Sequence, residues 1–77
     1  MPVPVWWPQV AATTRQMRRF TGMLLDLATP DWDGYTITLV FPGESAAVWR
    51  DSCSGRILTA ALRHHGVHVA VNVTAAG

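Results

Sequence analysis

The middle of the chain reads Asp33-Gly34-Tyr35-Thr36-Ile37-Thr38-Leu39-Val40-Phe41. Asp-Gly ahead of alternating apolar residues is a strong signal for a β-hairpin, because both residues tolerate the positive φ of a type I′ turn. Residues 35, 37, 39 and 41 then share one face of a strand, since side chains alternate along it. We therefore expect a short first arm at residues 31–32, a turn at Asp33-Gly34 and a second arm over residues 35–41.

Helical segments are expected before the hairpin. Three prolines in the first eight residues favour an extended lead over residues 1–6, and Pro8 suits the first turn of a helix. That helix can run over residues 9–14, and a stronger one follows, in which the apolar stripe is Met17, Phe20, Leu24 and Leu27. Gly22 disfavours an interior helical position by about 1 kcal/mol, so one kinked helix and two short helices both fit. Thr29-Pro30 ends this region, because a residue before proline avoids the α conformation.

A second helical pair is expected after the hairpin. Residues 44–52 form a short helix, residues 52–55 a break in which a serine can cap the next helix, and residues 56–65 that helix. The residues expected to face the core are Ala47 and Val48 in the first of these helices and Ile57, Leu58, Ala61 and Leu62 in the second.

The last element is a strand. Gly66 is well placed to stop the preceding helix, and valines then alternate with other residues over 67–73. The order is α(α)ββααβ, which predicts a single α+β domain over residues 7–74 and a frayed tail at 75–77. We expect a three-stranded sheet with helices on one face, and we expect the side chains buried against it to include Phe20, Leu24, Leu58 and Leu62.

Composition narrows the function. About half of the 77 residues are hydrophobic (49%), only 14% are charged, and the net charge is +1. So low a charge is typical of a surface partly covered by a partner, and it calls for neither nucleic acid nor a membrane. The single cysteine excludes an internal disulfide and fits a reducing compartment. The apolar N-terminus is too short, proline-rich and charge-poor for a signal peptide, so we expect a cytoplasmic protein.

No residue pattern predicts catalysis or metal binding. His64 and His68 are four residues apart, but Gly66 should end the helix between them, and no second cluster of ligands lies nearby. Cys53 has no obvious base beside it, so we interpret it as a buried or half-buried structural thiol. The acidic residues form no acid–base pair. We therefore expect a non-enzymatic domain without catalytic residues, cofactor or metal.

The residues that can bind a partner are aromatic and basic. Four tryptophans are too many for the core of so small a domain, and partly exposed aromatic residues are favoured interface anchors. We assign Trp7 to the core and leave Trp49 open between core and interface. The predicted partner-binding residues are Trp6, Trp32 and Trp49 as anchors and Arg15, Arg18 and Arg19 at the rim.

Nucleic acid is the alternative partner. Arg56 and Arg63 lie on one later helix, and the order ββααβ is similar to that of nucleic-acid-binding KH domains. The Gly-x-x-Gly loop of those domains is missing, because the connection over residues 52–55 contains one glycine.

Several short motifs follow one another across residues 7–73. They are Trp7-Pro8-x-Val10, an arginine-bearing helix closing in Met23-Leu24-Leu25, Asp33-Gly34-x-Thr36-Ile37-Thr38-Leu39-x-Phe41, and Ala60-Ala61-Leu62 before Gly66 and a Val-x-Val strand. In order and spacing this chain resembles the C-terminal domain of the gamma/tau subunit of bacterial DNA polymerase III, and the actinobacterial type most.

The resemblance implies a role in DNA replication. It implies a small α+β domain of KH-like outline that tethers the polymerase alpha subunit to the clamp loader. The expected partners are therefore the alpha subunit and clamp-loader subunits, with weak DNA binding possible and no membrane partner. The chain departs from the full subunit in having no P-loop or ATPase part, so it is either an excised domain or a free-standing relative. The family pattern supplies no catalytic residues.

Overall fold

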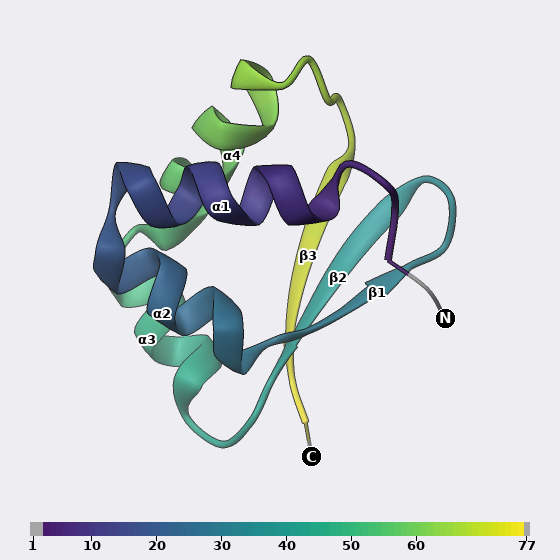
Figure 1. The fold of residues 1–77 in the computed structure, drawn as a ribbon. Coiled ribbons are helices and arrows are strands. Elements are labelled where there is room, and N and C mark those ends of the chain that lie inside the picture. Colours follow the sequence, from purple (N-terminus) through teal and green to yellow (C-terminus); the bar gives the residue numbers. More distant parts are fainter. Residues whose placement is uncertain (1–2, 77) are drawn as a thin grey trace.

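Residues 3–76, which the computed structural model describes, form helices and strands in the order ααββααβ (Figure 1). The predicted α+β fold is confirmed, with the helices packed on one face of a three-stranded sheet. The elements are α1 (Trp7–Met17), α2 (Arg19–Leu27), β1 (Thr29–Trp32), β2 (Thr36–Phe41), α3 (Ser45–Asp51), α4 (Ser54–His64) and β3 (Ala70–Ala75).

The predicted hairpin is present, but its turn is of another type. β1 runs antiparallel to β2 with Trp32 opposite Ile37, so Gly34 and Tyr35 occupy the centre of the turn. Of these two only Gly34 has a positive φ, +97°, whereas a type I′ turn needs positive φ at both central positions. Glycine at the first central position is the pattern of a type II′ turn. Tyr35 therefore lies in the turn, 83% exposed, and is not part of the buried strand face.

Asp33 holds this turn with its side chain. Its Oδ1 accepts hydrogen bonds from the backbone N–H groups of Thr36 at 2.7 Å and of Tyr35 at 2.8 Å. The bonds from Thr36 and Tyr35, in that order of size, stabilise the ionised form and hold the pKa of the Asp33 carboxyl below its usual value. The aspartate thus contributes its acceptor oxygen to the turn and does not itself adopt a positive φ.

The third strand lies beside β2 and parallel to it, so the sheet order is β1-β2-β3. β3 begins at Ala70, later than predicted, because Gly66 closes α4 with a Schellman motif. In that motif the N–H of Val67 donates to Leu62 O at 2.9 Å and the N–H of Gly66, at φ +69°, donates to Arg63 O at 3.0 Å. Residues 67–69 then connect the end of α4 to the sheet.

The C-terminal end of β3 also differs from the prediction. Ala75 pairs with Phe41, and the N–H of Ala76 donates to Phe41 O at 2.8 Å. The strand therefore continues past its predicted end at residue 73, and Ala75 belongs to the sheet and not to a frayed tail, because β2 offers a partner as far as Phe41. Gly77 lies outside the described residues.

The N-terminal lead is not uniformly extended where it is described. The N–H of Trp7 donates to Pro4 O at 3.0 Å, so Val5 and Trp6 form a turn, and Pro4 is buried. Pro8 stands in the first turn of α1, as predicted. The first two residues of the predicted lead lie outside the described range.

Two helices, not one kinked helix, precede the hairpin. The break is at Arg18, whose φ of −156° and ψ of 111° are extended. α1 and α2 pack closely where Gly22 faces Arg15: a Cβ placed on Gly22 would lie 2.7 Å from Arg15 Cα. Gly22 thus permits the helix contact instead of merely weakening α2.

The stripe predicted for α2 is wrong in its orientation. Phe20 and Leu27 are 42% and 53% exposed, and only Leu24 of the predicted stripe on this helix is buried. The buried face consists of Thr21, Gly22, Leu24 and Leu25. Thr21 and Gly22 face inward with the two leucines because α2 is pressed against α1 at Gly22 and joined to the start of α4 by the Thr21 hydroxyl, 3.0 Å from Ser54 Oγ.

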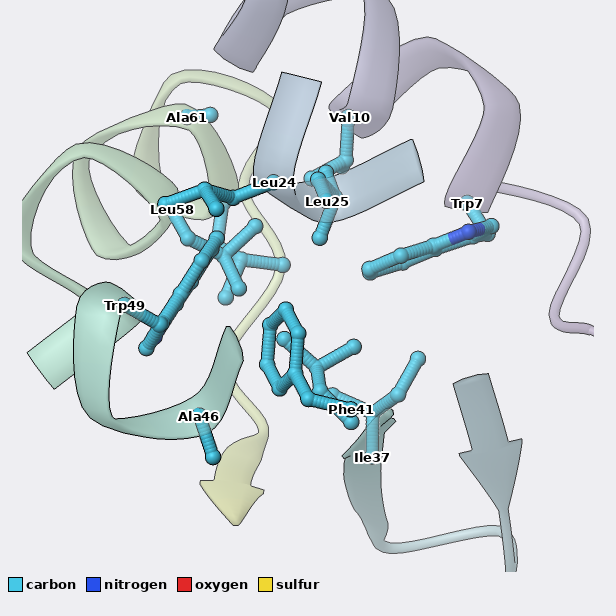
Figure 2. Close-up of a cluster of buried hydrophobic side chains, with 12 residues drawn as sticks. Trp7, Val10, Leu24, Leu25, Ile37, Phe41, Ala46, Trp49, Leu58 and Ala61 are labelled. Carbon is cyan, nitrogen blue, oxygen red and sulfur yellow. The ribbon is translucent and has the colours of Figure 1, made fainter. Parts of the chain in front are cut away.

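The core lies between the helices and the inner sheet face, where Ile37, Leu39 and Phe41 are fully buried (Figure 2). α4 contributes Leu58, Ala61 and Leu62 to it, as predicted, while Ile57 is only half-buried. In α3 the prediction is corrected: the buried residues are Ala46 and Trp49, whereas Ala47 and Val48 are exposed. The large ring of Trp49 fills the space beside Phe41, with ring centroids 5.2 Å apart, and this sets the rotation of the helix.

Candidate functional site

The four tryptophans separate into two groups. Trp7 and Trp49 are 9% and 2% exposed and belong to the core, which confirms the first assignment and excludes Trp49 as an exposed anchor. Trp6 and Trp32 are both half-buried and meet edge to face, with centroids 5.4 Å apart. The structure therefore brings two of the three predicted anchors together, where the start of α1 meets β1.

The three predicted rim arginines do not form one edge. Arg15 donates to Asp26 Oδ1 at 2.7 Å, an ion pair that joins α1 to α2. Arg18 donates to Ser52 O at 2.6 Å and stands 5.8 Å from the centre of the Phe20 ring. Arg19 is exposed and makes neither kind of contact within residues 3–76. Two of the three guanidinium groups are thus engaged in contacts within the domain.

A candidate surface that the sequence reasoning missed lies on α2. Phe20, Met23 and Leu27 are 42%, 59% and 53% exposed. They are spaced at i, i+3 and i+7, which places them on one side of the helix. We call these three residues the α2 stripe. The periodicity was visible in the sequence, but two of its members were assigned to the core.

A second missed feature is a groove between α4 and β3. It has a volume of about 480 Å³, and its walls include Arg56, Thr59, Ala60 and Arg63 from α4 and Val71 and Val73 from β3. The four α4 residues are spaced at i, i+3, i+4 and i+7 and therefore form one face of the helix. We call this feature the α4–β3 groove. The seven-residue spacing of its two arginines was the only sequence signal for it.

The histidines and the cysteine form no reactive cluster. The rings of His64 and His65 meet edge to face at 5.1 Å, and a 2.7 Å hydrogen bond joins His65 Nε2 to the Thr13 hydroxyl. Within residues 3–76, no three His, Cys, Asp or Glu side chains come together as possible metal ligands.

Cys53 is exposed, so its interpretation as a buried or half-buried thiol is wrong. It stands in the tight connection between α3 and α4 with a left-handed φ of 57°, at a position where the chain reverses on the surface. The serine cap expected there is replaced by an internal contact: Ser54 Oγ is buried and bonded to the Thr21 and Ser52 hydroxyls.

Comparisons with family models, with curated proteins and with solved structures found no match for this chain. Across the described residues, every helix falls short of the length and apolar character needed to cross a membrane.

Proposed function

We propose that this domain is a non-catalytic protein-interaction module of the bacterial replication machinery. Its partner is the alpha subunit of DNA polymerase III, which the domain joins to the clamp loader. The resemblance over residues 7–73 is the reason for naming the alpha subunit. The exposed apolar side chains of the α2 stripe are the reason for expecting that the partner is a protein.

The observation that carries the proposal is the α2 stripe. Three large apolar side chains stay in water on one side of a helix, although the same domain buries a well-packed core. Exposed apolar side chains that gather in one place mark contact sites for other proteins. A partner that covered the stripe would remove this apolar surface from water, at roughly 25 cal/mol per Å² of area buried.

The surroundings of the stripe suit a protein partner. Arg18 is held by Ser52 O and lies over one face of the Phe20 ring, so a guanidinium group borders the stripe. Arg19 adjoins the stripe and is exposed, so it can set orientation and on-rate at the rim. The Trp6–Trp32 pair is a second, separate contact candidate.

Binding of purified alpha subunit to this domain, measured by calorimetry, tests the proposal. Met23→Asp should weaken binding by roughly 30-fold if Met23 is an anchor, because anchor residues contribute about 2 kcal/mol or more. Tyr35→Ser removes a similarly exposed side chain from the hairpin turn and is the matched control. Trp32→Ala shows whether the tryptophan pair takes part. Failure of the unchanged domain to bind alpha subunit would overturn the choice of partner.

Single-stranded nucleic acid remains the second candidate, and one observation favours it. Arg56 and Arg63 line the α4–β3 groove on the same helix face, where they could meet phosphates. Titration with labelled single-stranded DNA at several salt concentrations separates the two candidates, since binding through phosphates weakens steeply with salt.

A further inference from the structure

We propose that the α4–β3 groove is a second binding site, which takes an acidic, extended peptide segment of a partner protein. The segment lies along the free edge of β3 and continues the sheet. This site is separate from the α2 stripe and does not depend on the identity of the polymerase partner.

The edge of the sheet supplies the backbone contacts. β3 is the last strand in the order β1-β2-β3, and in the described residues it pairs with β2 alone. On a strand the N–H and C=O groups of alternate residues point to opposite sides. Half of those in β3 therefore point away from β2, and such an edge is a template for an added strand.

The groove supplies a place for alternate side chains. Val71 and Val73 pair with Ile37 and Leu39 in the parallel register, so all four share the inner sheet face. The two β2 residues are fully buried, but the two valines are only half-buried, because α4 leaves them open to the groove.

Two further hollows adjoin the groove, one at each end. A hollow of about 400 Å³ shares Thr59, Arg63 and Val71 with it and continues to His68. Another, of about 490 Å³, overlaps the groove at Val71 and Val73 and continues toward the start of α4, as far as Arg50. An extended segment, whose side chains alternate, would place every second one in these hollows.

The charge of the groove selects acidic segments. Arg56 and Arg63 project from one face of α4 into the groove lining, and Arg50 stands at one end. All three are exposed, and the one ion pair within residues 3–76, Arg15–Asp26, involves none of them. Guanidinium groups without a carboxylate of their own can form bidentate bonds with the carboxylates of a partner.

The lining favours a peptide over a nucleic acid. Sequence-tolerant binding of single strands relies on exposed aromatic rings on which the bases stack. The aromatic ring in this lining belongs to Trp49, which is only 2% exposed and already packed on Phe41. The valine floor and the open strand edge instead match a peptide backbone with apolar side chains.

Titration of the isotope-labelled domain, followed by amide NMR, tests the proposal. The probe is a short peptide in which glutamate and aspartate alternate with valine; the matched peptide carries lysine in place of each acidic residue. We expect the acidic probe alone to shift the amide signals of residues 70–75 and of α4. Replacing both Arg56→Gln and Arg63→Gln should weaken its binding roughly tenfold, the effect of two exposed charge pairs. Arg19→Gln, an exposed arginine outside the groove, should leave binding unchanged.

Each contrary result has a defined meaning. Equal shifts with the lysine peptide, or no shifts in β3 with either, would overturn the proposal. Saturable shifts of the groove signals with an oligonucleotide but not with the acidic peptide would assign the groove to nucleic acid instead. Melting of each variant by circular dichroism shows that a loss of binding is not a loss of fold. Because the probe contains no polymerase sequence, its result is independent of whether alpha subunit binds the α2 stripe.

Discussion

Gly22→Ala is the sharpest test of how α1 and α2 pack. Alanine is the better helix former, so propensity alone predicts that this change stabilises α2 by about 1 kcal/mol. In the structure the added Cβ would lie 2.7 Å from Arg15 Cα and 2.8 Å from both Cβ and Cγ of Arg15. Ordinary carbon contacts are about 3.5–4.0 Å, so the two helices would have to separate by the order of 1 Å.

The two effects oppose each other, and the clash is the larger. Overpacking typically costs about 1–3 kcal/mol, and here the upper part of that range applies, because the closest atom belongs to the backbone of Arg15 and cannot rotate away. After the gain in propensity, the net loss is about 1–2 kcal/mol. For a domain of this size such a loss lowers Tm by roughly 5–15 °C.

The assay is urea unfolding followed by tryptophan fluorescence, with circular dichroism as a second probe of two-state behaviour. Gly55→Ala is the matched control. Gly55 is also helical, in α4, but its added Cβ would meet only Trp49 Nε1 at an ordinary 3.8 Å. We expect that control to be neutral or stabilising by up to about 1 kcal/mol. If Gly22→Ala were as stable as the original domain, the close approach of α1 and α2 would be refuted.

Three further changes test the hairpin, the core and the buried hydroxyls. Leu39→Ala should destabilise the domain by about 2–5 kcal/mol, since Leu39 is fully buried, and unfolding in urea measures it. Asp33→Asn should make the stability of the domain less dependent on pH in the acid range. The lowered pKa means that the Asp33 carboxylate stabilises the native state above its unfolded value of 3.8 and that this contribution disappears as the pH falls through the folded value. Equal acid sensitivity of the two proteins would contradict that assignment. Ser54→Ala should cost about 1–3 kcal/mol, because it takes away a partner of the buried Thr21 hydroxyl. Adding Thr21→Val should then cost less than the sum of the single changes, and full additivity would count against the contact.

Turn and helix-end residues were enough to predict where several local elements begin and end. Asp33-Gly34 with the alternation that follows it placed the hairpin, and the buried positions Ile37, Leu39 and Phe41 agree with it. Gly66 predicted the end of α4, because glycine is favoured where the residue just after a helix adopts a left-handed conformation. From such signals the order of elements and the α+β class could be predicted. The type of turn could not be predicted. Asp33 can either occupy a central position of the turn or precede it and accept hydrogen bonds with its side chain, and the structure shows the second arrangement.

Which side of α2 and of α3 is buried depends on the contacts between elements and could not be predicted from the sequence. Phe20 and Leu27 fit a core stripe as well as an exposed one, since periodicity reports spacing and not which neighbour a face meets. The Gly22–Arg15 approach and the Thr21–Ser54 contact, each between residues of different helices, turn α2 so that Thr21 and Gly22 face inward. The same rotation leaves the α2 stripe in water. The α4–β3 groove arises in a similar way, from the distance at which α4 passes the last strand. Candidate sites of this kind are set by contacts between elements, and a local pattern along the chain carries no record of those contacts.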